Sequence, residues 1–208
     1  MYKKFLLLAI ALLGFNGAFA QAKDWGGIYG QLGIGYQTAS YSATGGSSAG
    51  NPYSLGFSNS SGFASRVGIG YNNAITDKWL IGVGVDHFPS KGGNTTATAS
   101  SNGTTISDTL NINTVTNYFV EAGYVLDAET MTYLKLGNST TTYGGNLGAG
   151  SNKGTDFGFG LRHSILGSIF GYAEVNYIQG KAASDGFNTG GTIKSPNTFV
   201  ILGAGYVF

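Results

Sequence analysis

Apolar and polar residues alternate with a period of two along most of this chain. In residues 199–208 the even-numbered positions are all apolar or aromatic, while Gly203 and Gly205 occupy odd-numbered positions. In residues 62–72 the apolar side chains again share one parity, and Arg66 has the other. Because successive side chains of an extended strand point to opposite faces, each such segment predicts a β-strand with one apolar face.

Eight segments have this pattern, and each is close to the length of about 9–11 residues that a tilted strand needs to cross a bilayer. They lie at residues 25–36, 62–72, 79–88, 114–125, 131–143, 155–164, 169–179 and 197–208. The connections after the first, third, fifth and seventh segments are long and rich in Gly, Ser, Thr and Asn, and the three others are short. This predicts an all-β fold, a transmembrane up-and-down antiparallel β-barrel with long extracellular loops and short periplasmic turns.

The first twenty residues have a different pattern. A charged start, "MYKK", precedes the apolar run "FLLLAIALLGF", and "AFA" at 18–20 fits a small-residue cleavage site. These features predict that residues 1–20 are a signal peptide cleaved after Ala20, which exports the protein. Residues 21–208 are then expected to form a single barrel domain.

Composition supports a protein that is not a typical soluble enzyme. Only 10% of the residues are charged, and the chain has 36 Gly, 13 Tyr and 13 Phe. It has no cysteine, which excludes disulfides and thiolate chemistry. The formal net charge is +1 and no basic stripe is present, so nucleic acid is not an expected partner.

The charged residues within the predicted strands have the parity opposite to the apolar face. A charge on the lipid face of a barrel costs about 2–4 kcal/mol at mid-bilayer, so we expect these side chains to point into the lumen. Their charges cancel, which predicts a lumen network of ion pairs and hydrogen bonds, because buried charges persist when they are paired. The six residues are Arg66, Asp86, Glu121, Lys135, Arg162 and Glu174.

Aromatic residues and glycines complete the pattern. Tyrosine and tryptophan near the short-turn ends are expected to form an interfacial girdle, namely Tyr71, Trp79, Tyr124 and Tyr206. Tyr36 and Phe88 are the candidates for a second girdle at the other boundary. Many glycines have the inward parity, where a missing side chain relieves crowding and permits the bending that closes a narrow barrel.

Together, the predicted signal peptide, the eight amphipathic segments, the motifs "GIGY", "EAGY" and "GAGY" and the terminal aromatic residue resemble the small outer-membrane β-barrel family. That family includes the outer-membrane protein A and X barrels and the opacity-type "porin family" surface proteins, and the resemblance covers residues 21–208. It implies a place in the outer membrane of a Gram-negative bacterium. It also implies that the last strand is a signal to the barrel-assembly machinery, carried here by Val200, Leu202, Ala204, Tyr206 and Phe208.

Three functions are compatible with such a barrel. The first is a structural or surface-interaction protein without an open channel, whose extracellular loops contact a ligand or a host surface. The second is a small porin-like barrel that passes small solutes or apolar compounds, although eight strands leave an interior just wide enough for side chains. We expect a monomer in contact with outer-membrane lipid, including lipopolysaccharide.

The third function is an outer-membrane enzyme, a lipid A-modifying enzyme or a protease. The best candidate group is Asp86, His87 and Ser90 at the outer end of one strand, but Asp86 and His87 have opposite parity. His163 and Ser164 are adjacent in sequence and therefore also point apart. We expect no catalytic site, no cofactor and no metal centre, since nucleophile, base and acid must lie within mutual reach.

Overall fold

The computed structural model describes residues 22–44, 47–48, 51–52, 54–89, 93–102, 104–145, 150–181, 183–184, 192–194 and 196–208. The predicted signal peptide and Ser90 lie outside these residues. Within the described part of the chain, the structure contains no helix that is both long and apolar enough to cross a membrane.

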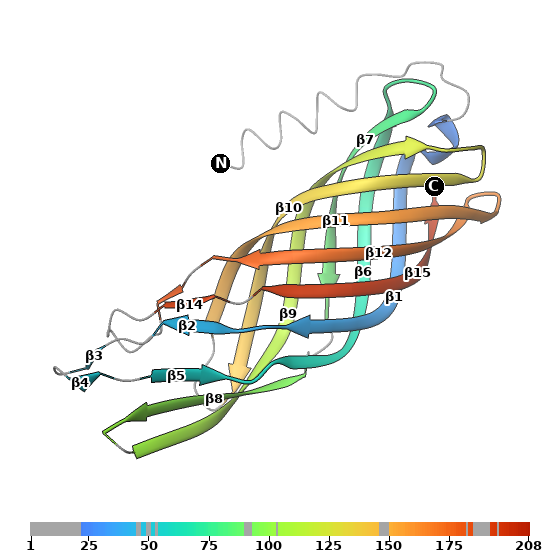
Figure 1. Ribbon diagram of the computed structural model, residues 1–208. Helices are drawn as coiled ribbons and strands as arrows, with labels where there is room; N and C mark the ends of the chain where they lie inside the picture. The colour runs from blue at the N-terminus through green and yellow to red at the C-terminus, as the bar shows by residue number, and fades with distance from the viewer. Residues whose placement is uncertain are drawn as a thin grey trace.

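Eight long strands form a closed antiparallel barrel (Figure 1). They are β1 (Gly27–Ala39), β6 (Ser60–Ala74), β7 (Trp79–Phe88), β9 (Thr104–Val125), β10 (Thr130–Gly145), β11 (Gly150–Leu166), β12 (Ile169–Gly180) and β15 (Asn197–Val207). Each strand pairs with its neighbour in sequence among these eight, and the ring closes where β15 pairs with β1, with Gly33 opposite Gly203. The predicted all-β barrel is confirmed.

The outer surface of the barrel carries a continuous apolar belt. Its larger side chains are 40% to 66% exposed. They include Ile28, Leu32, Ile34, Tyr36, Phe63, Val67, Ile69, Trp79, Tyr118, Leu134, Leu136, Phe157, Phe159, Leu161, Val175, Tyr177, Val200, Leu202 and Tyr206. A belt of this kind on a closed barrel is the surface that a bilayer covers.

The belt ends on every strand toward the end of the barrel away from the short turns. There the outward positions become polar and form what we call the outer polar ring: Thr38, Ser61, His87, Thr116, Asn138, Thr155, Gln179 and Thr198. Several of these residues are paired directly across strands, such as Thr38 with Thr198 and Thr155 with Gln179. The short turns and the C-terminus lie at the opposite end of the barrel (Figure 1).

A short 3-10 helix, η1 (Ala22–Trp25), fills the end of the barrel that carries the short turns. Ala22 is fully buried, and its backbone N–H donates to the carbonyl oxygen of Asp77 at 3.1 Å. The Trp25 ring meets the Phe170 ring edge-on, with centroids 6.0 Å apart. The helix thus closes this end with apolar side chains.

At the other end the strands run further than the sequence predicts. β9 begins at Thr104 rather than near residue 114, and it pairs there with β8 (Asn94–Ser101), inside a segment expected to be a loop. The fifth connection was also expected to be long, but β10 and β11 extend until only residues 146–149 separate them. Both expectations are wrong. The segment at 89–113 is rich in threonine, whose β-branched side chain favours strands. The segment at 144–154 has no threonine, and there β10 and β11 continue by pairing with each other as far as Tyr143 opposite Gly150.

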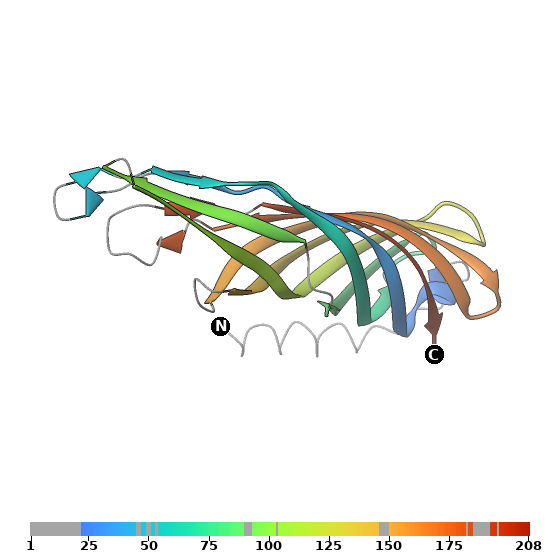
Figure 2. The ribbon, with the colours of Figure 1, turned by 90° about the horizontal axis from the view of Figure 1, so that it is seen from below.

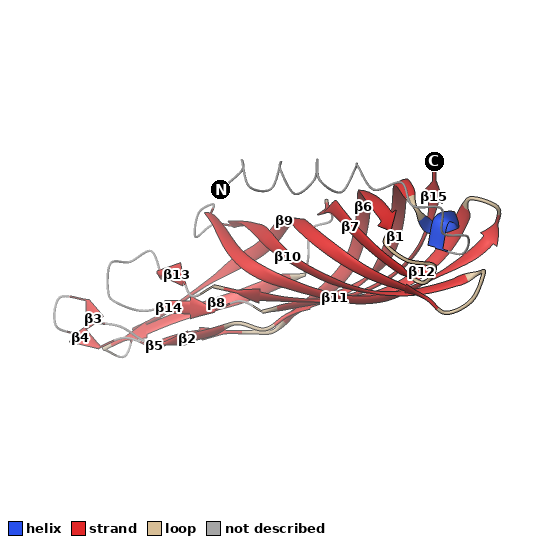
Figure 3. Ribbon diagram, turned by 90° about the horizontal axis from the view of Figure 1, so that it is seen from above, coloured by secondary structure: helices blue, strands red, loops and turns tan. Residues whose placement is uncertain are grey.

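The remaining short strands lie at this same end, beyond the outer polar ring. They are β2 (Ser42–Thr44), β3 (Ser47–Ser48), β4 (Asn51–Pro52), β5 (Ser54–Phe57), β13 (Ala183–Ser184) and β14 (Thr192–Lys194). β5 pairs with β8, so β5, β8 and the first half of β9 form one sheet, which we call the extracellular sheet. Figures 2 and 3 show that it continues the barrel wall well past the barrel body.

Candidate functional site

The barrel interior contains two ion-pair clusters. In the first, the Lys135 ammonium lies 3.0 Å from Asp86 Oδ2 and 2.8 Å from Glu174 Oε2. The Arg66 guanidinium pairs with the same two carboxylates, at 3.6 Å from Asp86 and in close contact with Glu174. These four side chains are at most 1% exposed and come from four different strands. Two cations and two anions therefore neutralise one another inside the barrel.

The second cluster lies nearer the short turns. Arg162 Nη1 and Nη2 donate to the two carboxylate oxygens of Glu121 at 2.6 and 2.9 Å. The Arg162 guanidinium also lies 4.3 Å from the ring centroids of both Tyr29 and Tyr133. Tyr133 in turn donates its hydroxyl to Glu174 at 2.5 Å, which joins this cluster to the first. The structure thus brings all six sequence-predicted lumen residues into one connected network.

Sequence reasoning missed a seventh buried charge. Asp156 on β11 is fully buried, and its Oδ2 accepts a hydrogen bond from Asn117 Nδ2 at 3.1 Å. The ion pairs formed by the described residues do not include it. The sequence carried the signal, because Asp156 shares the parity of Arg162 on the same strand.

Large side chains fill the space around the network. On the side of the network toward the extracellular sheet, the ring centroids of Phe88 and Phe199 lie 4.5 Å apart. Below it, Phe170 and Trp25 pack against each other and close the lumen. Phe88 is only 1% exposed, so its expected place in an aromatic girdle is wrong. It directly follows the outward-facing His87, and alternation turns its ring inward.

The four girdle residues predicted near the short turns have outward positions there, and Tyr36 is exposed on the outer surface toward the other end of β1. The rings of Trp79 and Tyr124 face each other across β7 and β9, with centroids 4.8 Å apart. The rings of Tyr206 and Phe208 contact each other on the same outer surface, with centroids 5.1 Å apart. Near this boundary Lys78 lies 5.9 Å from the Tyr124 ring. Aromatic rings beside a cation are the usual composition of a membrane–water interface.

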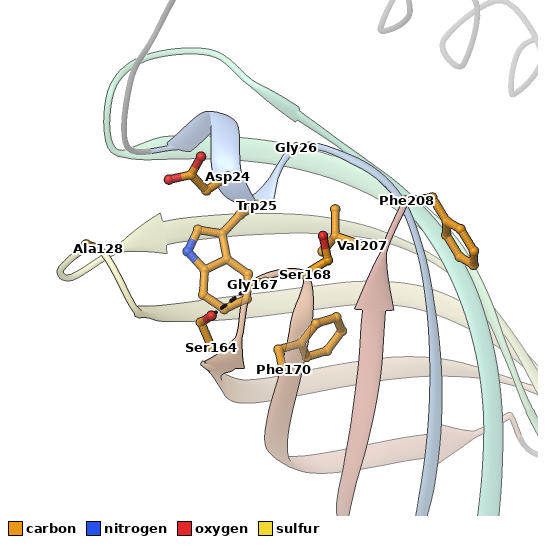
Figure 4. Close-up of a pocket in the computed structure, with 10 residues that line it drawn as sticks. All are labelled: Asp24, Trp25, Gly26, Ala128, Ser164, Gly167, Ser168, Phe170, Val207 and Phe208. Atoms are coloured by element: carbon orange, nitrogen blue, oxygen red, sulfur yellow. Dashed lines mark hydrogen bonds between the residues drawn. The ribbon is translucent and has the colours of Figure 1, made fainter.

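The surface of the barrel has two depressions of note. The first, of about 480 Å³, lies at the short-turn end, where Asp24 and Trp25 of η1 face the β11–β12 turn and Phe170 (Figure 4). Ser164 donates its hydroxyl to the Gly167 carbonyl there at 3.2 Å. The packed rings of Trp25 and Phe170 separate this depression from the ion-pair network.

The second depression, of about 430 Å³, lies on the outer wall. Leu32, Val67 and Leu202 line it, together with Pro89. The β6–β7 ladder stops here at the pair Val67–His87, and Pro89 follows the end of β7. Proline has no N–H to donate, so it is unable to extend the ladder.

The candidate catalytic groups are not assembled. Asp86 lies inside, bound to Lys135, whereas His87 lies outside, with its Nδ1 2.9 Å from Thr116 Oγ1. His163 Nδ1 instead lies 3.1 Å from Thr130 Oγ1. Among the described residues no three His, Cys, Asp or Glu side chains are grouped so that they could hold a metal ion.

The extracellular sheet is anchored to the barrel by side-chain contacts at its base. Ser60 donates its hydroxyl to the Gly93 carbonyl, and Thr95 donates to the Ser58 carbonyl at 2.8 Å. The rings of Tyr41 and Phe57 stack, with centroids 5.6 Å apart. Burial raises the pKa of the Tyr41 hydroxyl above its usual value, so it stays neutral. These contacts join the sheet to the end of the barrel.

The closed ring of eight antiparallel strands, the apolar belt and the filled polar interior define a transmembrane β-barrel of the outer-membrane type. No protein-family model matches the chain. No curated protein matches its sequence either. Its fold is nevertheless similar to that of several solved outer-membrane proteins.

The outer membrane protein OprG from Pseudomonas aeruginosa superposes with a TM-score of 0.54 at 10% identity, covering 88% of this chain and 97% of that one. Neisserial surface protein A gives 0.52 at 15% identity, with 87% and 97% coverage. The outer membrane protease OmpT from Escherichia coli gives 0.51 at 12% identity, with 93% and 99% coverage. The chain therefore has the fold of small outer-membrane barrels, and that fold serves proteins with different activities.

Proposed function

We propose that this protein lies in the bacterial outer membrane as a non-enzymatic, non-conducting barrel that presents the extracellular sheet to a partner outside the cell. The observation that carries the proposal is the continuation of the barrel wall into that sheet. β9 runs from Val125 near the short turns to Thr104 at the tip, a single strand of 22 residues. Function on such scaffolds resides in segments held outside a rigid frame.

The surface of the extracellular sheet suits recognition by hydrogen bonding. Thr96, Thr104, Thr105 and Ser107 are exposed. Hydroxyl groups both donate and accept, and a pleated sheet spaces them regularly. A glycan or the polar backbone of an extracellular protein offers the matching donors and acceptors.

The filled interior supports the non-conducting part of the proposal. The ion-pair network occupies the middle of the lumen, η1 closes one end, and the Phe88–Phe199 pair lies toward the other. An eight-stranded barrel has room for its own side chains, and wide aqueous channels belong to barrels of about 16 strands. Displacing one of these ion pairs would strand a buried charge.

Shortening the extracellular sheet tests the proposal. Residues 96–109 are replaced by Asn-Gly, which joins the opposed residues Thr95 and Leu110 by a two-residue turn. The intact barrel in nanodiscs is expected to bind at least one member of an array of surface glycans and extracellular-matrix proteins, and the shortened barrel to bind at least about tenfold more weakly, as loss of a hydrogen-bonded contact surface implies.

The control is Glu129→Gln, an exposed position in the turn between β9 and β10 at the opposite end. It is expected to bind like the unaltered protein. Both variants are checked for a folded barrel by the change in gel mobility on heating. Equal binding by the shortened and intact barrels would contradict the proposal, and so would the absence of binding by either.

Vesicle permeability tests the closed lumen separately. Liposomes that contain the protein are expected to release a trapped sugar and trapped ions no faster than empty liposomes, because packed side chains occupy the lumen. Stepwise conductance in a planar bilayer would contradict a closed lumen.

A second candidate function is the passage of small apolar compounds. The observation that favours it is the outer-wall depression beside Pro89, where the β6–β7 ladder stops and the wall is lined by Leu32, Val67 and Leu202. The same vesicles discriminate the two functions. Faster entry of an uncharged apolar dye, with ions still retained, would favour this candidate over the first.

A further inference from the structure

Two lysines lie directly opposite each other on neighbouring strands, outside the outer polar ring. The backbone N–H of Lys181, just after β12, donates to the carbonyl oxygen of Lys153 on β11 at 2.8 Å. The adjoining pair is Gly154 with Gly180. Both lysine side chains are exposed and have the outward parity of the belt residues on their strands.

A third lysine lies on the next strand. β13 follows Lys181 after one residue and pairs with β14, with Ala183 opposite Ile193. Lys194 is adjacent to Ile193 and is exposed. The pairing displaces Lys194 by one residue from the position opposite Lys181, so Lys153, Lys181 and Lys194 lie near one another on three successive strands. We call these three residues the lysine row.

The height of the row corresponds to the lipid headgroups. On β12, Tyr177 is the last aromatic residue of the belt, Gln179 belongs to the outer polar ring, and Lys181 follows. Four residues of a strand tilted by about 40° rise roughly 10 Å along the bilayer normal. A lysine side chain can fold back several ångströms toward the membrane, so its ammonium reaches the headgroup layer.

The row is a local concentration of charge. Two residues beyond the outer polar ring, where β11 and β12 have Lys153 and Lys181, the other six strands have uncharged residues: Ser40, Asn59, Pro89, Thr114, Thr140 and Pro196. Like charges placed directly opposite each other on a sheet destabilise the pair. The ion pairs of the described residues include none of these three lysines. An anion held between them would remove that repulsion.

We propose that the lysine row binds a phosphate group of lipopolysaccharide in the outer leaflet. The outward parity of Lys153 and Lys181 turns them toward the surrounding lipid rather than toward the tip of the extracellular sheet, which favours a lipid phosphate over a soluble polyanion. Clustered ammonium groups attract anionic headgroups strongly when they lie at the level of the headgroup layer. The site is separate from the extracellular sheet, so it does not depend on the partner proposed above.

The test uses the double variant Lys153→Gln/Lys181→Gln, with Lys78→Gln as the matched control. Lys78 is also exposed, but it lies in a turn at the opposite end, so the control loses charge on the side without lipopolysaccharide. Folded protein in detergent is incubated with diphosphorylated lipid A, and bound lipid is counted by native mass spectrometry. The double variant is expected to bind about tenfold more weakly than the unaltered protein, and Lys78→Gln to bind like it.

Two further measurements test whether the lysine row recognises the lipid phosphate. With lipid A from which both phosphates have been removed, the unaltered protein and the double variant are expected to bind equally weakly. A sulfated polysaccharide fragment is then offered as a soluble polyanion. The proposal fails if the double variant retains full lipid A affinity, or if the substitutions weaken binding of the soluble polyanion alone. Gel mobility before and after heating confirms that each variant is folded.

Discussion

Replacing Glu121 by glutamine is expected to lower the free energy of unfolding by about 3–5 kcal/mol, the usual cost of removing one partner of a buried ion pair. Glu121 receives two hydrogen bonds from the Arg162 guanidinium, and both side chains are 1% exposed. The rings of Tyr29 and Tyr133 lie against the same guanidinium. Glutamine keeps the size of Glu121 but leaves the Arg162 charge without a counter-ion in a site that water does not reach.

Urea unfolding of the refolded barrel, followed by tryptophan fluorescence, measures the loss. The double variant Glu121→Gln/Arg162→Met removes both charges and is expected to regain most of the stability, because a neutral pair carries little desolvation cost. Glu129→Gln, which changes an exposed carboxylate in a turn, is expected to shift the unfolding free energy by less than about 0.5 kcal/mol. Equal effects of Glu121→Gln and Glu129→Gln would contradict the ion-pair interpretation.

The barrel strands could be predicted because the information for them is local. In a closed barrel one face of every strand meets lipid, so the alternation is visible within each segment of the sequence. The same alternation assigned Arg66 and Glu174 to the side opposite the apolar residues, and the structure places both inside. Whether a residue faces the lipid or the lumen depends on its odd or even position within one strand, so the sequence of that strand is enough to predict it.

The partners of the buried charges could not be predicted from the sequence, because they depend on the geometry of the whole barrel. Arg66 on β6 and Glu174 on β12 are 108 residues apart, and they meet across the lumen only when strand tilt and register are fixed. Asp156 illustrates a different limit. Its parity was visible, but its neighbours Thr155 and Phe157 gave no sign that its carboxylate would be buried beside Asn117 rather than beside a cation.

The ends of the strands were the least predictable part. Residues 94–113 are rich in Thr, Ser and Asn, which the loops of outer-membrane barrels share with exposed strands. Once past the belt, a strand has no lipid face, and the apolar alternation that marks a transmembrane segment disappears. The extracellular sheet is held instead by pairings between β5, β8 and β9, which no local pattern reveals.

The inward glycines show how the barrel accommodates large interior rings. A side chain added at Gly70 would meet the Tyr29 ring, and one added at Gly84 would meet Phe119, each with a closest approach of 2.5 Å. Each glycine lies where a ring from another strand crosses the interior wall. The aromatic residues that surround the ion pairs therefore require small residues opposite them, and parity alone identifies the glycines but not their ring partners.

Gly70→Ala is expected to lower the free energy of unfolding by about 1–3 kcal/mol, because the added methyl group overlaps the Tyr29 ring and the packed lumen has no space into which the ring can move. The nearest atoms to the added carbon all belong to the Tyr29 side chain, at 2.5 to 2.7 Å. Gly150→Ala is the matched control, since an added carbon there meets no atom within 4 Å. Its effect is expected to stay within about 0.5 kcal/mol.

A double-mutant cycle with Tyr29→Ala separates steric overlap from a change in backbone conformation. If the ring causes the loss, Gly70→Ala costs little once Tyr29 is truncated, and the coupling energy falls between about 0.5 and 3 kcal/mol. Tyr29→Ala alone is itself destabilising, because it opens a cavity and removes a ring from Arg162. Additive losses in the cycle would mean that Gly70 is needed for the bending of β6 rather than for the space it leaves, so the two roles of an inward glycine can be told apart at this one position.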